Sequence, residues 1–143
     1  METACYCTSL RVAMRRMTAI YDRALEPAGI TVAQWALLRR IPSSGDEPIT
    51  IQDLAERAEL ERSTVARNLR VLEKSGLVKM GTSSADRRAT DIVLTEKAER
   101  VAAHAMPLWH NAQAEVERML TVEGAGELRS LALSVSTAES SSS

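Results

Sequence analysis

The sequence is poor in aromatic residues and in the groups that perform acid–base or metal chemistry. Its 143 residues include no phenylalanine, two tryptophans, two tyrosines and two histidines. Leucine, valine, alanine and methionine must therefore fill any core, and 45% of the residues are hydrophobic. There is no Gly-rich phosphate loop, no nucleophile elbow and no His-Glu-x-x-His zinc helix. We expect neither an enzyme nor a bound cofactor.

Disulfide bonds and targeting segments are also missing. The only cysteines, Cys5 and Cys7, are separated by a single residue. A disulfide bond between them would be strained and could not connect distant parts of the chain. No apolar run reaches the ~18 residues of a membrane-spanning helix. No basic segment leads into an apolar one at the N-terminus, so we expect no signal peptide and a cytoplasmic protein. The serine-rich residues 137–143 are expected to form a flexible tail.

The most informative stretch is 60–95, and its first half has the pattern of an amphipathic helix. Val65, Leu69 and Leu72 recur at helical spacing and predict one buried stripe. At about 100° per residue, the opposite side carries a small polar residue and three cations. These are Ser63, Arg67, Arg70 and Lys74.

The second half of this stretch predicts a β-hairpin. Two short apolar runs, 77–80 and 92–94, have the composition of strands, and the turn-prone residues 81–88 separate them. Residues 62–88 hold seven cations and two anions, a net charge of +5, whereas residues 46–61 hold one cation and six anions, a net charge of −5. The whole chain carries only −1. The local positive field favours a polyanion such as nucleic acid as the partner.

The preceding residues predict three helices. Apolar residues at intervals of three and four indicate the first, over about 8–25. Thr31 and Gln34 have the spacing of a capping box, so a second helix is expected to start near Val32. Thr50 at the same kind of position predicts a third over 51–58.

After the hairpin, Thr95 is expected to cap a long fifth helix, which Pro107 should kink. A sixth helix is predicted over about 123–135. The third and fourth helices with their short turn indicate a helix-turn-helix. The first, fifth and sixth helices carry more apolar surface than so small a unit needs, which favours a homodimer.

With these elements in place, the chain resembles the MarR family of winged-helix repressors from about Cys7 to Val135. The segments that carry the resemblance are ERSTVARNLRVLEKSGLV, similar to the family's recognition helix, and DRRATDIVLT, similar to its wing. The resemblance implies a mainly α fold with a small β-wing. It assigns residues 31–95 to a DNA-binding winged helix-turn-helix, and 1–30 with 96–136 to helical dimerisation.

The resemblance further implies recognition helices in two successive major grooves of a pseudo-palindromic operator. Arginine suits both guanine edges and a narrow minor groove. On the wing, Arg88 would enter the minor groove, Asp86 would orient it, and Arg87 would contact phosphate. On the helix, the residues expected to contact bases or phosphates are Ser63, Thr64, Arg67, Arg70 and, less directly, Lys74.

The resemblance also suggests how binding is released: by a small aromatic ligand, a metal or thiol oxidation. Cys7 lies where one branch of the family has a hydroperoxide-sensing cysteine, 14 residues before Tyr21, but Val32 replaces that branch's second tyrosine. Cys7 can be read as an inert, partly buried thiol, a redox sensor or a metal ligand. Cys5 can be read as a bystander or a resolving thiol.

A ligand crevice is implied between the dimer helices and the winged helix. Its lining would include Met14, Met17, Trp35 and Trp109, which are also ordinary candidates for the core. His104 and His110 are six residues apart and form no ready zinc site. The remaining alternatives are a metal-responsive winged-helix sensor and a winged helix that binds protein instead of DNA.

Overall fold

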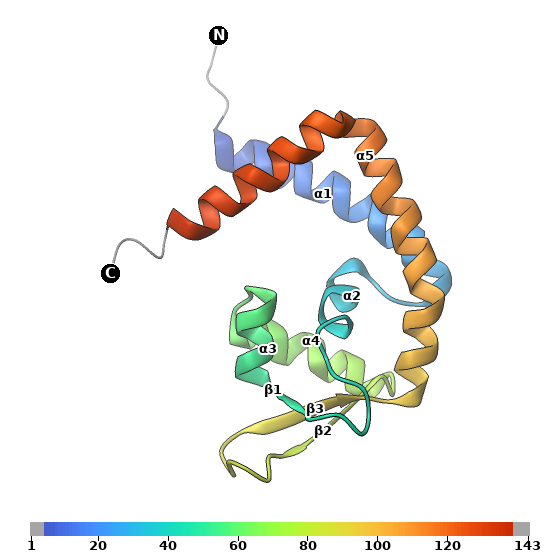
Figure 1. Ribbon diagram of the computed structural model, residues 1–143, viewed down its shortest axis with the longest axis vertical. Coiled ribbons are helices and arrows are strands. Elements are labelled where there is room, and N and C mark those ends of the chain that lie inside the picture. Colours follow the sequence, from blue (N-terminus) through green and yellow to red (C-terminus); the bar gives the residue numbers. More distant parts are fainter. Residues whose placement is uncertain (1–4, 139–143) are drawn as a thin grey trace. The chain divides into compact units, whose positions relative to one another are not determined.

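The computed structural model describes residues 5–138 and has the mainly α fold with a small β-wing that the sequence predicts. The elements run in the order α1 (Tyr6–Leu25), a 3-10 turn η1 (Glu26–Ala28), α2 (Val32–Leu38), β1 (Ile49–Thr50), α3 (Ile51–Ala58), α4 (Arg62–Lys74), β2 (Val78–Thr82), β3 (Thr90–Leu94) and α5 (Glu96–Ala138) (Figure 1). They form two compact units, Met1–Trp109 and His110–Ser143.

Local capping explains where three of the helices begin. The Thr31 side chain accepts the N–H of Gln34, whose own side chain accepts the N–H of Thr31, so the predicted capping box at the start of α2 is confirmed. Thr50 accepts the N–H of Asp53 at the start of α3. Thr95 accepts the N–H of Ala98 at the start of α5. Each cap satisfies a backbone donor that the helix itself leaves unpaired.

Helix α4 ends in a Schellman motif at Ser75 and Gly76. Gly76 has φ +73°, its N–H donates to Glu73 O, and the N–H of Leu77 donates to Leu72 O. Leu72 and Leu77 are both buried. The chain therefore turns directly from the recognition helix into the wing.

The sheet is antiparallel in the order β1-β3-β2, with Met80 opposite Ile92 on one side and Ile49 opposite Ile92 on the other. The β2–β3 hairpin extends away from the helices (Figure 1). The strands are longer than the predicted 77–80 and 92–94, and the two-residue β1 was not predicted. The core of this unit includes Trp35, Leu37, Leu54, Leu69, Leu72 and Ile92.

The second unit contains the end of α5, and the position of its bend differs from the sequence prediction. Pro107 keeps helical backbone angles, whereas Thr121 has φ +64° and ψ +167° and marks the kink (Figure 1). The Thr121 hydroxyl accepts the N–H of Gly124, so Thr121 caps the helical stretch after the break. That stretch corresponds to the predicted sixth helix. Arg129 and Glu117, on opposite sides of the break, form an exposed ion pair of 3.1 Å.

Candidate nucleic-acid interface

Helix α4 separates apolar and polar residues as the sequence predicts. Val65, Leu69 and Leu72 have no exposed surface. Ser63, Arg67, Arg70 and Lys74 are exposed, and Thr64 is half-buried. The buried stripe fixes the rotation of α4 about its axis, and the three cations and the serine consequently face outward.

The start of α4 is poorly capped. Glu61 occupies the N-cap position without a side-chain hydrogen bond, and the first turn has no acidic residue. Arg62 is the first helical residue instead. The first-turn donors of α4 are therefore not satisfied by a side-chain cap.

The wing loop is held by short-range hydrogen bonds. The Ser83 N–H donates to Ala89 O, and the Ala89 N–H donates to Asp86 O, both at 3.0 Å. The Asp86 carboxylate accepts the backbone N–H of Arg88 at 2.9 Å. Asp86 therefore fixes Arg88 through its backbone, not through the guanidinium.

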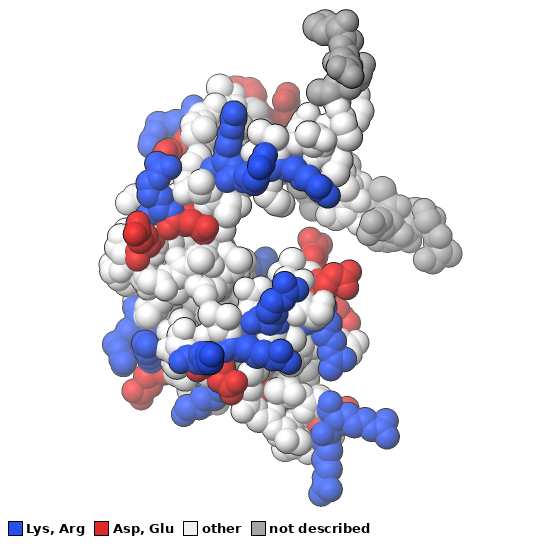
Figure 2. All heavy atoms as spheres, turned by 180° about the vertical axis from the view of Figure 1, so that it is seen from behind, with Lys and Arg blue, Asp and Glu red and all other residues white. Residues whose placement is uncertain are grey.

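The tip of the wing is cationic and accessible. Arg87 and Arg88 are exposed. Figure 2 shows blue side chains projecting from the end of the hairpin, at the lower right of the view. Within residues 5–138, no carboxylate lies within ion-pair distance of either guanidinium. Both charges are available to an anion from outside the chain.

A groove connects α4 with the wing. It has a volume of about 380 Å³ and is bordered by the start of α3, the first residue of α4 and the loop of the wing. Arg62 and Arg88 both line it. Sequence reasoning did not single out Arg62, because its position beside the wing loop depends on the tertiary arrangement of α3, α4 and the hairpin.

The start of α5 is joined to the end of α4. The Thr95 hydroxyl donates to Gly76 O at 2.6 Å, and the Thr95 N–H donates to Leu77 O at 3.1 Å. The Lys97 ammonium donates to Ser75 O at 2.7 Å, where the negative end of α4 favours a cation. These three hydrogen bonds hold the first turn of α5 against the end of α4.

The two cysteines are free and exposed, so the one reading of Cys7 that supposed a partly buried thiol is wrong. Cys5 occupies the N-cap position of α1. The backbone N–H of Thr8, followed by its hydroxyl, lowers the pKa of Cys5 below the usual thiol value. Cys7 and Tyr21 lie 14 residues apart on α1, or about 21 Å along the axis, so they cannot meet within one subunit.

The four residues of the implied ligand crevice have different surroundings. Trp35 is 2% exposed, and its indole N–H has no hydrogen-bond partner in the described part of the chain. Its ring is tilted by 51° against that of Trp109, with centroids 6.4 Å apart, and Arg39 lies 4.3 Å from the Trp109 centroid. Met17 is half-buried, whereas Met14 is 67% exposed and is not a core residue.

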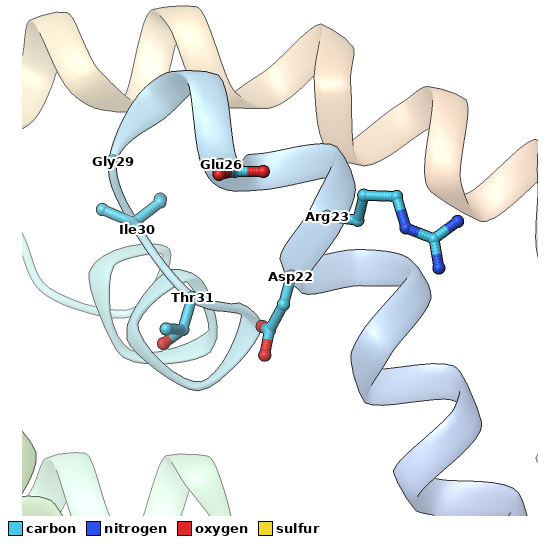
Figure 3. Close-up of a pocket in the computed structure, with 6 residues that line it drawn as sticks. All are labelled: Asp22, Arg23, Glu26, Gly29, Ile30 and Thr31. Carbon is cyan, nitrogen blue, oxygen red and sulfur yellow. The ribbon is translucent and has the colours of Figure 1, made fainter.

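A second hollow, of about 400 Å³, lies where α1 passes into α2 (Figure 3). Asp22 points toward the start of α2, and its carboxylate accepts the N–H of Val32 at 2.8 Å, while Arg23 points away (Figure 3). The contact ties α1 to α2. Within residues 5–138, no three His, Cys, Asp or Glu side chains are grouped to hold a metal. Over the same residues, no helix has the length and hydropathy needed to cross a membrane.

A helix-turn-helix followed by a β-hairpin with an exposed cationic tip defines a winged-helix protein. Comparison with known proteins narrows this class. A family profile described as MarR family matches residues 28–89. The transcriptional regulator MosR of M. tuberculosis, solved in complex with DNA, is 35% identical, with 96% of this chain and 97% of that chain covered and a TM-score of 0.83.

A second structure of MosR is 34% identical over 95% of this chain and 96% of that chain, with a TM-score of 0.78. S. aureus MepR, solved with DNA, is 20% identical over 95% and 99% of the two chains, with a TM-score of 0.79, and shows the shared fold alone. The chain belongs to the MarR family of DNA-binding transcriptional regulators. The prediction that it is not an enzyme is confirmed.

Proposed function

We propose that the protein is a homodimeric repressor that binds a pseudo-palindromic operator in the cytoplasm. The observation that carries this proposal is the exposed polar stripe of α4 together with the cationic wing that follows it. The stripe fits a major groove, where side chains can reach base edges. The wing suits the adjacent minor groove, whose negative potential attracts arginine. MosR, which is 35% identical to this chain, was solved in complex with DNA, and this supports DNA as the partner here.

The individual contacts follow from where each side chain lies. Arg67 and Arg70 on the exposed face of α4 contact bases or phosphates, with Ser63 and Thr64 contributing from the first turn and Lys74 from the last. Arg88 enters the minor groove, and Arg87 contacts phosphate. Asp86 holds the wing turn through the Arg88 N–H.

Dimerisation is assigned to residues 1–30 and 96–136, and DNA binding to 31–95. Large apolar side chains are exposed on both dimerisation segments, which is unusual for a surface that stays in water. On α1 they are Tyr6, Leu10 and Met14. On the end of α5 they include Met119, Leu131 and Val135. A twofold pair of subunits would bury these residues and place two recognition helices about one helical turn of DNA apart.

Release from the operator is proposed to follow thiol oxidation or the binding of a small aromatic ligand. Cys5 supports the first route, because a lowered pKa increases the share of reactive thiolate. The tryptophan pair supports the second, because the indole N–H of Trp35 is a donor without a partner among the described residues. A gel shift with and without mild peroxide, repeated with Cys5→Ser and Cys7→Ser, assigns the thiol route.

The function is tested by operator selection followed by a wing substitution. Purified protein is used to pull down genomic DNA, and the enriched site is measured by gel shift with competitor DNA. Arg88→Ala should weaken operator binding by about tenfold or more, since a specific arginine contact contributes roughly 1–3 kcal/mol. Wild-type affinity should also fall steeply with salt, because several phosphates are neutralised.

Arg100→Ala provides the control, because Arg100 is an exposed arginine on α5 outside the proposed interface. This variant should bind as the wild type does. No operator enrichment, or binding that does not change with salt, would refute the DNA-binding proposal and favour a winged helix that binds protein.

A further inference from the structure

The groove between α3 and the wing combines side chains from three elements. α3 contributes its first residues, α4 contributes Arg62, and the wing contributes the loop between β2 and β3 with the first residue of β3. The full lining is Thr50, Ile51, Gln52, Asp53, Arg62, Ser83, Ala85, Asp86, Arg88, Ala89 and Thr90. Two of these residues, Arg62 and Arg88, are exposed cations on different elements.

Arg62 is placed where helix electrostatics disfavour it. It is the first residue of α4, beside the partial positive charge of the helix N-terminus, where an acidic side chain would be stabilising. Its side chain is exposed. No carboxylate within residues 5–138 lies within ion-pair distance of it. Arg62 therefore gains no compensating partner from the fold, and an external anion would provide one.

The proposed binding mode supplies such an anion at this position. If α4 lies in a major groove and the wing in the neighbouring minor groove, one sugar-phosphate strand separates the two. In this mode the strand passes between the first residue of α4 and the loop of the wing, where this groove lies. In this mode Arg88 enters the minor groove from the wing side, and Asp86 accepts its backbone N–H.

We propose that this groove holds a phosphate of the operator strand, with Arg62 as a further DNA-positioning residue. The inference rests on the proposed DNA-binding function. A phosphate contact fixes orientation and register but carries no base information. Arg62 accordingly adds affinity for DNA of any sequence, while the exposed face of α4 and Arg88 supply the preference for the operator.

Substitution of Asp53 is predicted to change DNA affinity in the opposite direction to substitution of Arg62. It lines the same groove, and its side chain is exposed. Its carboxylate repels a phosphate held there, whereas the second carboxylate of the groove, Asp86, accepts the Arg88 N–H. Replacing Asp53 by asparagine removes the repulsion with little change in size, so it should tighten binding where Arg62→Ala loosens it.

The experiment measures fluorescence anisotropy of labelled operator and of an unrelated duplex over a series of salt concentrations. Arg62→Ala should weaken binding to both duplexes by the same factor. It should reduce the slope of log affinity against log salt by about 2 per dimer, one phosphate for each subunit. Arg62→Lys should retain most of the affinity, because lysine still supplies a point charge to phosphate. Asp53→Asn should raise the affinity for both duplexes.

Arg100→Ala is again the control, and thermal melting verifies that each variant is folded. If both Arg62→Ala and Asp53→Asn keep the wild-type affinity and salt slope, the inference about this groove is wrong. The proposed DNA-binding function still stands in that case, provided that the wild type binds and that Arg88→Ala weakens binding. A loss confined to the operator, with Arg62→Lys as weak as Arg62→Ala, would also overturn it, since that pattern indicates base reading. A wild type that binds neither duplex instead overturns the proposed function itself.

Discussion

The two thiols at the start of α1 differ in their surroundings, although both are exposed. Cys5 precedes the first turn, where the Thr8 N–H and then its hydroxyl stabilise a thiolate and lower the pKa of Cys5. Cys7 lies one residue inside the helix. Because the thiolate is the nucleophile, Cys5 should be the more reactive of the two below the ordinary pKa of a thiol.

This difference predicts the outcome of alkylation with iodoacetamide at a series of pH values, followed by mass spectrometry. Cys5 should be modified at a rate that rises at a lower pH than for an ordinary thiol, because its pKa is lowered. This reaction should disappear in Cys5→Ser and persist in Cys7→Ser. A Cys5 rate that rises only at the pH of an ordinary thiol would contradict the assignment.

For single residues, the sequence predicts a structural role correctly where that role depends on neighbours a few positions away in the chain. Thr31, Thr50 and Thr95 each cap a helix through a residue three positions later, and all three caps are confirmed. The environment of Cys5 was missed because the helix was expected to begin near residue 8, while α1 begins at Tyr6. Arg62 was missed because its groove is completed by wing residues more than 20 positions away.

Among the elements, α4 has an end whose backbone conformation can be tested directly by substitution. Gly76 has φ +73°, and a Cβ added there would meet only Lys97 Cδ at 3.8 Å, an ordinary contact. Replacing Gly76 by alanine therefore tests the left-handed backbone without a steric clash. It should reduce the free energy of unfolding by about 1–2 kcal/mol. Denaturant unfolding at fixed protein concentration measures the change.

Gly126→Ala is the matched control for this substitution. Gly126 lies within α5 without a positive φ, and a Cβ there would meet nothing within 4 Å. Alanine should stabilise that helix by up to about 1 kcal/mol. Two substitutions of the same chemistry should thus have opposite effects on stability, and a loss of equal size at both sites would contradict the backbone argument.

The elements that sequence reasoning missed or misplaced have weak local signals. β1 has only two residues, Ile49 and Thr50, and exists because β3 pairs with it. The kink of α5 was expected at Pro107, but the backbone leaves helical angles at Thr121, a residue without the turn preference of glycine or asparagine. Long periodic segments such as α4 were placed correctly because their apolar spacing is itself the signal.

For the whole molecule, the decisive feature is apolar surface that one chain leaves exposed. Tyr6, Leu10 and Met14 are 81%, 60% and 67% exposed and follow one another at intervals of four, so they share one face of α1. On α5, Leu131 is 63% exposed. The proposed homodimer would cover this surface, and it would also double the number of phosphates that one protein particle neutralises.

The dimer can be tested by placing a charge on this surface and measuring mass and DNA binding together. Leu10→Glu combined with Leu131→Glu should convert a dimer into a monomer in analytical ultracentrifugation, because burying a carboxylate without a partner is costly. The monomer should bind the operator weakly and with about half the wild-type salt slope, since the slope follows the number of phosphates neutralised. Ala19→Glu is the control, because Ala19 is exposed on the opposite side of α1 from Leu10. A double variant that remains dimeric and binds as the wild type does would place the subunit contact elsewhere, whereas a monomeric wild type would remove the twofold arrangement altogether.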